Sequence, residues 1–265
     1  METIYKKNYM EINKNEKVSI LMDIVTWIKN YAIEHNVNLV VGISGGIDSA
    51  VVSTLSALTN LDTYVVSLPI NQNKGQLERA DKHIEWLKSK FSNVKRLDFD
   101  ISDIYKIFFN KFPAPFNNSL SFANSKSRLR MVCLYHISTN INGIVVGTGN
   151  KVEDFGIGFF TKYGDGGVDI SPIADFTKTE VRNLAKDLGI IEDIILAKPT
   201  DGLWDDDRCD EDQIGATYEE LEWAMDFCGD QTVLSNRERE VYDIFSKLNK
   251  KNRHKMVSIP IYKKK

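Results

Sequence analysis

The chain has 265 residues, of which 42% are hydrophobic and 27% are charged, and its formal net charge is −3. A chain of this size and composition buries a sizeable core without a disulfide or a structural metal. So small a net charge gives no general attraction to nucleic acid or to a membrane surface. No apolar run resembles a signal peptide or approaches the ~20 residues of a membrane span. Three cysteines with no CxxC pair favour a reducing compartment and argue against a zinc site. We therefore expect a cytoplasmic protein with no nucleic-acid partner and no membrane association.

Charge is nevertheless unevenly distributed along the chain. Residues 201–212 hold seven carboxylates against one arginine, whereas residues 247–265 hold eight Lys or Arg residues and no acid. The plainer interpretation is a solvated loop followed by a soluble tail. The functional alternative is a mobile acidic loop and a basic segment that reaches an anionic substrate.

Hydrophobic periodicity predicts helices that alternate with short buried strands. Residues 18–35 carry a helical apolar stripe, and residues 37–43 form a β-branched run that ends in glycine. Further strands are expected at 63–70, 94–99 and 143–147, and further helices at 48–58, 77–91, 125–141, 177–189, 217–228 and 234–250. This order predicts a single Rossmann-like α/β domain over residues 1–265, with a parallel sheet of about five strands and helices on both faces. Segments 148–178 and 198–215 are expected as loops over the carboxyl ends of the strands, where ligands bind in such sheets.

A glycine-rich hexapeptide, residues 44–49 (Ser-Gly-Gly-Ile-Asp-Ser), stands between a predicted strand and a predicted helix. Its glycines allow backbone geometry that is closed to other residues and let N–H groups approach an anion closely. The helix that follows adds free amides and a partial positive charge. Asp48 would be repelled by bare phosphate, so it is a candidate ligand of a Mg²⁺ ion that bridges phosphates. A plainer interpretation is a tight turn in which Asp48 and Ser49 cap the helix. The complete order of strand, hexapeptide and helix favours phosphate binding.

The hexapeptide is not a Walker A loop, because no Lys-Ser/Thr pair follows its last glycine. It resembles the signature of the ATP pyrophosphatase superfamily, whose members cleave ATP between the α and β phosphates. This resemblance implies adenylyl transfer rather than γ-phosphoryl transfer. The loop alone does not choose among the members, which include ligases and tRNA-modifying enzymes.

Later segments resemble the NAD synthetase family. The most specific are residues 147–151 (Gly-Thr-Gly-Asn-Lys), followed by Glu153, and residues 160–169 (Phe-Thr-Lys-Tyr-Gly-Asp-Gly-Gly-Val-Asp). The resemblance runs from residue 37 to about residue 257, which is nearly the whole chain. Ser67 departs from it, because many members have an arginine there, near the adenine. A glutamine-dependent member carries an additional glutaminase domain, and 265 residues leave no room for one. We therefore expect the chain to use free ammonia, unless a separate subunit supplies it.

The resemblance implies a role for each residue that matches a family motif. ATP would be bound by Gly42, Ile43, Ser44, Gly45, Gly46, Ile47, Asp48, Ser49, Thr148, Lys178 and Thr200. Mg²⁺ would be bound by Asp48 and Glu153. The deamido dinucleotide would be bound by Arg128, Lys162, Asp169, His254 and Lys255. The expected catalytic residues are Asp48, Lys162, Asp169 and Lys178. By residue type alone, the basic members of this set are ordinary surface groups, and only the resemblance assigns them to a substrate.

The implied reaction is the amidation of deamido-NAD (nicotinate adenine dinucleotide) to NAD with ammonia and ATP. A carboxylate is a poor electrophile at neutral pH, because attack on it must expel oxide from an anion. Adenylation replaces that leaving group with AMP and releases pyrophosphate, and ammonia then attacks the acyl adenylate. Mg²⁺ and lysines would offset the charge on the departing pyrophosphate. The resemblance also implies a homodimer with the dinucleotide site near the subunit interface.

The glycine-rich loop is compatible with two other functions. A tRNA-modifying ATP pyrophosphatase would need a basic face or an RNA-binding domain, together with cysteines if it thiolated its substrate, and neither feature is visible in the sequence. A nucleotide-binding module without turnover would not need both predicted metal ligands, Asp48 and Glu153. Their presence favours an enzyme.

Overall fold

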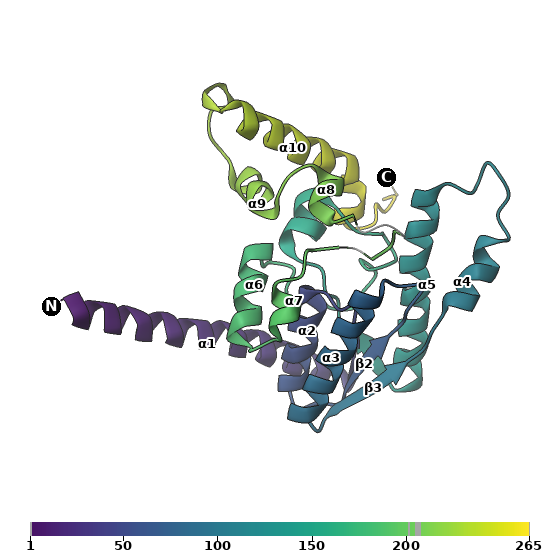
Figure 1. Cartoon of the computed structure of the whole chain (residues 1–265), viewed down its shortest axis with the longest axis horizontal. Helices are drawn as coiled ribbons and strands as arrows, with labels where there is room; N and C mark the ends of the chain where they lie inside the picture. Colours follow the sequence, from purple (N-terminus) through teal and green to yellow (C-terminus); the bar gives the residue numbers. More distant parts are fainter. Residues whose placement is uncertain (1, 201, 205–207, 265) are drawn as a thin grey trace.

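A computed structural model describes residues 2–200, 202–204 and 208–264. Its centre is a sheet of four parallel strands in the order β3-β2-β1-β4 (Figure 1). The strands are β1 (Asn38–Gly42), β2 (Thr63–Ser67), β3 (Val94–Asp98) and β4 (Gly143–Val145). Because all four run in one direction, their carboxyl ends lie along a single edge of the sheet.

Strand β1 shows how the sheet is buried on both faces. Its three central residues, Leu39, Val40 and Val41, are completely buried. Leu39 and Val41 join one apolar cluster, whereas Val40 joins the cluster on the opposite face. Successive side chains of a strand point to opposite faces, so an unbroken apolar run fits a strand that is covered on both sides.

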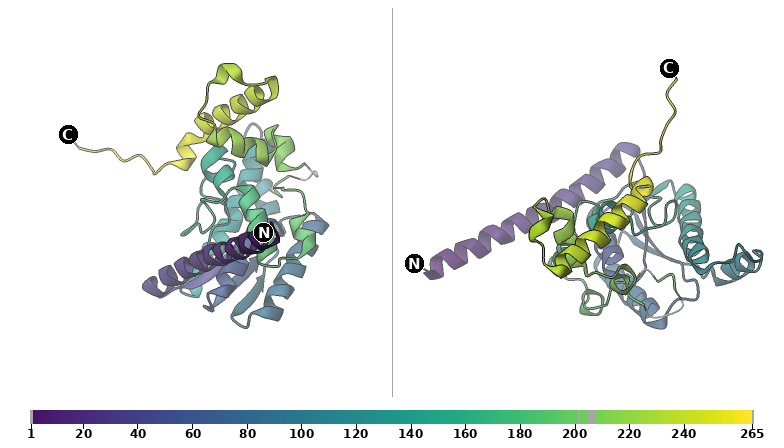
Figure 2. Two further views of the ribbon diagram at one scale, coloured as in Figure 1. Left: turned by 90° about the vertical axis from the view of Figure 1, so that its left-hand side faces the viewer. Right: turned by 90° about the horizontal axis from the view of Figure 1, so that it is seen from above.

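Helices cover the two faces unequally. The cluster that contains Leu39 and Val41 draws its helical residues from α1 (Glu2–His35), α2 (Ile47–Leu58), α3 (Lys74–Lys90), α6 (Lys178–Asp187) and α7 (Glu192–Ile195). The cluster that contains Val40 is built with α4 (Ser102–Phe109) and α5 (Ser119–Asn140). Figure 2 shows the amino-terminal part of α1 projecting away from these layers.

A third apolar cluster lies at the end of the molecule away from β2 and β3 (Figure 1). It is formed by the π-helix η1 (Val152–Ile157) with α8 (Asp210–Ile214), α9 (Tyr218–Asp226) and α10 (Asn236–Met256). A short 3-10 helix, η2 (Gln231–Val233), separates α9 from α10. This cluster places η1 and α9 side by side beyond the carboxyl edge of the sheet.

The predicted parallel α/β fold with helices on both faces is confirmed, with differences in detail. The sheet has four strands rather than about five, because the next parallel pairing is only the isolated bridge between Val146 and Ile170. The segments expected as loops contain η1 and α8, and neither α4 nor α7 was predicted. A helix of four to six residues is too short to reveal a period of 3.6 residues. In the described part of the chain, no helix is long and apolar enough to cross a membrane.

Candidate active site

The glycine-rich loop joins the carboxyl end of β1 to the start of α2. Gly46 is the N-cap of α2 and makes no side-chain cap hydrogen bond, so the alternative in which Asp48 and Ser49 cap the helix is wrong. Gly45 has a φ of +81°, and a Cβ atom there would lie 2.4 Å from the Gln76 carbonyl oxygen. Only glycine fits both the dihedral angle and the space. The loop thus brings the positive end of α2 to the edge of the sheet, where an anion is stabilised.

Ser44 and Ser49 link the two ends of this loop. Their hydroxyl oxygens are 3.1 Å apart, and the Ser49 hydroxyl also donates to the Gly46 carbonyl at 2.9 Å. The backbone N–H of Gly46 donates to Ser44 Oγ at 3.2 Å. The two serines therefore hold the turn closed as well as placing hydroxyl groups beside it.

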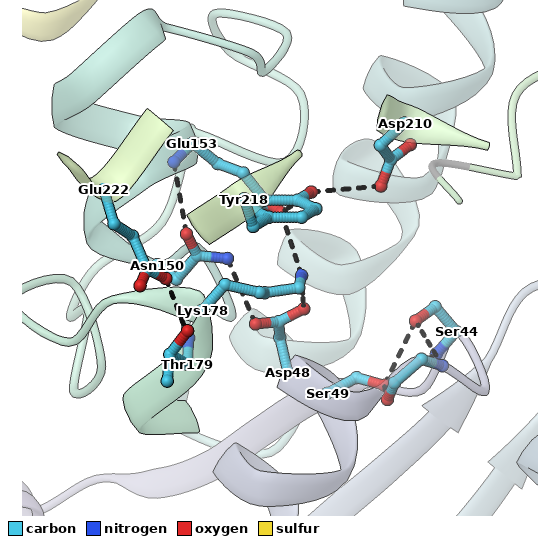
Figure 3. A network of polar contacts seen from close by, with 11 residues as sticks. Ser44, Asp48, Ser49, Asn150, Glu153, Lys178, Thr179, Asp210, Tyr218 and Glu222 are labelled. Carbon is cyan, nitrogen blue, oxygen red and sulfur yellow. Dashed lines mark hydrogen bonds and ion pairs between the residues drawn. The ribbon is translucent and has the colours of Figure 1, made fainter. Parts of the chain in front are cut away.

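Lys178 lies between Asp48 and Glu153. Its Nζ atom is 2.6 Å from Asp48 Oδ2 and 2.9 Å from Glu153 Oε1. The Lys178 side chain is 3% exposed, and each carboxylate side chain is 17% exposed. One ammonium group thus joins α2, η1 and α6 at the carboxyl edge of the sheet (Figure 3). With two carboxylates and one ammonium, the group carries one net negative charge.

Asn150 and Tyr218 complete the frame around this ion pair. The Asn150 amide donates to Asp48 Oδ1 at 3.2 Å, and its carbonyl oxygen accepts from the Glu153 N–H at 3.1 Å. The Tyr218 hydroxyl donates to Glu153 Oε1 at 2.5 Å. Both framing residues are completely buried. Each carboxylate therefore has a fixed direction before any ligand arrives.

Burial and charge shift the pKa values of this group in different directions. Burial opposes the charge of Lys178, but its two carboxylate neighbours outweigh burial and raise the pKa of Lys178. Burial is the largest influence at Asp48 and raises the pKa of that carboxyl group in spite of Lys178. Burial also acts on Glu153, but the charge of Lys178 and the Tyr218 hydrogen bond overcome it and lower the pKa of Glu153. Glu153 is accordingly the more firmly ionised of the two carboxylates.

The start of α6 sets the position of Lys178. Thr177 is the N-cap, and its side chain and that of Glu180 form the capping box that the sequence predicts. Lys178 is the first residue of the helix, and the next residue, Thr179, donates its N–H to Glu222 Oε1 of α9 at 2.8 Å. Capping and this tertiary hydrogen bond keep the lysine directed toward α2.

A cavity of about 270 Å³ opens beside these groups. It is lined by every residue expected to bind ATP or Mg²⁺, namely residues 42–49, Thr148, Glu153, Lys178 and Thr200. Ser67 and Leu68, at the end of β2, also line it. There Arg130 of α5 donates to the Leu68 carbonyl at 3.0 Å and to Gln72 Oε1 at 2.7 Å. Many family members have an arginine at the position of Ser67. In this chain the Arg130 guanidinium, from α5, lies next to that position.

The NAD synthase family model matches residues 20–259 of the chain. The chain belongs to the NAD synthase family. An NH3-dependent NAD⁺ synthetase of Carboxydothermus hydrogenoformans is 36% identical over 249 residues, which cover 93% of this chain and 96% of the relative. One from Alkaliphilus metalliredigens is 37% identical over 246 residues and covers 90% and 95% of the two chains.

Two solved structures of synthetases share the fold. An NMN synthetase from Francisella tularensis superposes with a TM-score of 0.81 at 30% identity and covers 93% of this chain and 98% of its own. An NH3-dependent NAD synthetase from Campylobacter jejuni has a TM-score of 0.74 at 25% identity and covers 93% and 99%. The family resemblance of the motifs is therefore confirmed, which disfavours the tRNA-modifying interpretation.

None of the residues expected to bind the dinucleotide lines the cavity. Four of them lie close together, namely Arg128, Lys162, His254 and Lys255. Arg128 donates to the Lys162 carbonyl at 3.2 Å, and Lys162 Nζ donates to the His254 carbonyl at 2.8 Å. Lys255 Nζ donates to the Phe160 carbonyl at 2.6 Å. These contacts place basic side chains of α5, of the 160–162 segment and of α10 along one surface.

Asp169 is held separately from that basic surface. Its Oδ1 atom accepts from the Tyr135 hydroxyl at 3.1 Å, and its Oδ2 atom accepts from the Val145 N–H at 2.8 Å. The two carboxylate oxygens of Asp169 thus hold the segment after Gly167 against α5 and β4. In the structure its contacts are those of a residue that anchors a loop, and its role toward the substrate stays a prediction.

Three residues of this family site were not expected from the sequence. Asn150 belongs to the Gly-Thr-Gly-Asn-Lys motif, and the position of its amide close to Glu153 in the sequence could have indicated a role. Asp210 is 5% exposed and lines the cavity, although the acidic run to which it belongs predicts a solvated loop. Tyr218 has no sequence signal at all, because its partner Glu153 is 65 residues away. Residues 201 and 205–207 of the predicted acidic loop lie outside the described residues.

The donor set around Lys178 suits a hard cation in the NAD synthase site. Asp48 and Glu153 each direct one carboxylate oxygen at the Lys178 ammonium, so the two carboxylates lie close together, and Mg²⁺ prefers oxygen ligands. Two carboxylates supply fewer than the ~6 oxygen ligands that Mg²⁺ takes, so phosphate and water oxygens would complete the shell. The residues fit an ion that is shared with a bound nucleotide.

Proposed function

We propose that this chain uses ATP to join ammonia to the nicotinate carboxylate of deamido-NAD, with NAD, AMP and pyrophosphate as products. One observation carries the proposal. The anion-binding loop at Gly45 and the ion pair of Lys178 with Asp48 and Glu153 line the same cavity, in a chain that belongs to a family of carbon–nitrogen ligases.

The reaction proceeds in two substitutions. A carboxylate oxygen of the substrate attacks the α phosphorus of ATP, a new P–O bond forms, and the bond to the bridging oxygen of pyrophosphate breaks. Ammonia then attacks the acyl carbon, the C–O bond to AMP breaks, and the nitrogen loses one proton. No nucleophilic side chain is required, because the substrate carboxylate and ammonia are themselves the nucleophiles.

The residues of the cavity supply charge and orientation. Amides at the start of α2 and the hydroxyls of Ser44 and Ser49 bind the triphosphate. Lys178, a compact cation, offsets the charge that develops on the departing pyrophosphate. Asp48 and Glu153 would hold a Mg²⁺ ion, and such an ion would supply further charge neutralisation at the phosphates. Thr148 and Thr200, which also line the cavity, contact the nucleotide.

The dinucleotide lies on the basic surface formed by Arg128, Lys162, His254 and Lys255. Arginine grips a phosphate or carboxylate with two parallel hydrogen bonds, and lysine adds a point charge. Asp169 keeps the intervening segment in place. We further propose a homodimer in which this surface lies near the subunit interface, and light scattering that gave a monomer would argue against the dimer.

Isotope transfer tests the reaction. Purified protein is incubated with ATP, Mg²⁺, ammonium and deamido-NAD whose nicotinate carboxylate carries ¹⁸O. One ¹⁸O atom is expected in AMP, together with one pyrophosphate for each NAD formed. Label in inorganic phosphate with release of ADP would contradict adenylation. Binding of ATP without any turnover would support a nucleotide-binding module instead. Glutamine in place of ammonium should give no NAD.

A second candidate substrate is the nicotinate mononucleotide. The Francisella tularensis protein, which superposes with a TM-score of 0.81, is described as an NMN synthetase. The carboxylate to be adenylated is the same in both substrates, so the cavity chemistry does not separate them. Competition between equal concentrations of the two acids, followed by mass spectrometry of the amides, measures the ratio of kcat/KM values directly. We expect the dinucleotide to be preferred, and a preference for the mononucleotide would replace the first assignment.

A further inference from the structure

Tyr218 is the first residue of α9 and is completely buried. The N-cap Thr217 and Glu220 form a capping box that fixes the backbone at this point. The Tyr218 N–H donates to Glu211 Oε1 of α8 at 3.1 Å. The Tyr218 side chain belongs to the third apolar cluster, and its hydroxyl end lies beside Glu153 and Asp210 (Figure 3).

The hydroxyl of Tyr218 faces two carboxylates. It lies 2.5 Å from Glu153 Oε1 and 3.3 Å from Asp210 Oδ2. A phenol has one proton to donate, and an ionised carboxylate can only accept. The shorter distance assigns that proton to Glu153. A hydrogen bond to a buried charged oxygen contributes more than one between neutral groups.

The ring of Tyr218 contacts the other member of the ion pair. Lys178 Nζ lies 4.8 Å from the ring centroid, within the range of a cation–π interaction. The hydroxyl therefore contacts the negative member of the ion pair, Glu153, and the ring contacts its positive member, Lys178. Residues that merely fill a core do not need this combination, because packing is supplied by the ring alone.

We propose that Tyr218 is a positioning residue, which holds Glu153 directed at Lys178 so that the carboxylate is ready for the magnesium nucleotide. The expected loss of catalytic rate rests on the proposed function, whereas the expected loss of Mg²⁺-dependent nucleotide binding does not. Tyr218→Phe keeps the ring, its packing and its contact with Lys178, and removes only the hydroxyl. The matched control is Tyr64→Phe in β2, which removes a hydroxyl that accepts from Lys95 at 3.3 Å in a solvent-exposed contact.

Equilibrium binding is the first measurement. Isothermal titration calorimetry with α,β-methylene-ATP, which is not cleaved between those phosphates, is run with and without Mg²⁺. In Tyr218→Phe we expect binding with Mg²⁺ to weaken about tenfold or more and binding without Mg²⁺ to stay unchanged. Kinetics should show kcat lower by about 10- to 100-fold, with a higher Mg²⁺ concentration for half-maximal rate. Tyr64→Phe should match the wild type throughout.

A double-mutant cycle separates positioning from general packing. If Tyr218 acts through Glu153, then adding Tyr218→Phe to Glu153→Gln should change Mg²⁺-dependent binding by less than about twofold, although Tyr218→Phe alone changes it about tenfold. Equal effects in both backgrounds would overturn the proposal. Wild-type binding and kcat in Tyr218→Phe would overturn it too, as would failure of that variant to fold, which would assign Tyr218 to the core. Inactive wild-type protein would refute the proposed function and leave the binding test in force.

Discussion

Lys178 Nζ lies 2.6 Å from Asp48 Oδ2, although the two residues are 130 positions apart in the chain. The contact joins the first turn of α2, next to the glycine-rich loop, to the first residue of α6. Both helices begin at the carboxyl edge of the parallel sheet, and this common edge is what lets their termini meet. The same ammonium group also reaches Glu153 of η1, so three segments of the cavity depend on one side chain.

Lys178→Met should remove both stability and activity. Methionine fills similar space, but it leaves two mostly buried carboxylates facing each other without a counter-charge. Loss of one partner from a buried ion pair destabilises a protein by about 3 kcal/mol or more. Urea denaturation gives the free energy of unfolding, and pyrophosphate release gives the activity. The control is Lys186→Met at an exposed position of the same helix, which should change neither. A Lys178→Met protein with normal pyrophosphate release would contradict the assigned role.

Gly45→Ala should destabilise the loop and abolish nucleotide binding. Alanine at a φ of +81° is strained, and its Cβ would lie 2.4 Å from the Gln76 carbonyl oxygen. We expect a loss of about 2 kcal/mol or more in the free energy of unfolding. Gly189→Ala separates the two causes, because Gly189 has a φ of +67° with no atom within 4 Å of the added Cβ. It should lose about 1 kcal/mol and keep nucleotide binding, measured by calorimetry. Equal losses in the two variants would show that crowding has no part.

Asn150→Asp should inactivate the protein by adding a third carboxylate beside Asp48 and Glu153. The substitution removes the amide that donates to Asp48 Oδ1 and places a negative charge at a completely buried position. We expect pyrophosphate release to fall at least about 100-fold, since a lost charged hydrogen bond and a buried repulsion act together. Asn93→Asp is the control, because Asn93 donates to two carbonyl groups far from the cavity. Asn93→Asp should lower stability but leave kcat unchanged. Equal losses of kcat in Asn93→Asp and Asn150→Asp would show that the effect is not specific to the site beside Asp48 and Glu153.

His83 should make stability depend on pH in the acid range. It is completely buried in α3, its Nε2 atom lies 2.9 Å from Ser53 Oγ, and burial lowers the pKa of His83 to about 4. The unfolded chain, with a pKa of about 6.5 at this residue, takes up a proton before the folded protein does. Stability is therefore complete above about pH 6.5 and is lost progressively as the pH falls toward 4, by about 3 kcal/mol in all.

His83→Gln keeps a polar group for Ser53 and cannot titrate in this range. Urea denaturation of the variant between pH 7 and pH 4 should show a weaker decline in the free energy of unfolding, smaller by about 3 kcal/mol than in the wild type. The exposed His136, changed to Gln, serves as the control and should follow the wild type. Identical declines in all three proteins would show that His83 is not the group responsible.

Local patterns determined much of the fold and the outline of the site. The β-branched run of β1 has to be buried on both faces, and the glycine-rich loop has to be a turn before a helix, because both follow from neighbouring residues. The capping box at Thr177 is likewise local, and it is present as predicted. Family motifs then named Asp48, Glu153 and Lys178, and the structure brings all three to one cavity.

Tertiary structure alone decided how these groups are arranged. Lys178 lies between Glu153, 25 positions away, and Asp48, 130 positions away. The Asn150 amide reaches Asp48 across 102 positions, and the Tyr218 hydroxyl reaches Glu153 across 65. No periodicity or motif encodes such distances, because they depend on which helices meet at the edge of the sheet. The fourth strand ends the sheet for the same reason, since among the described residues only Val146 and Ile170 pair beyond it. The sequence thus determined which chemical groups are available, and packing decided which charges face one another.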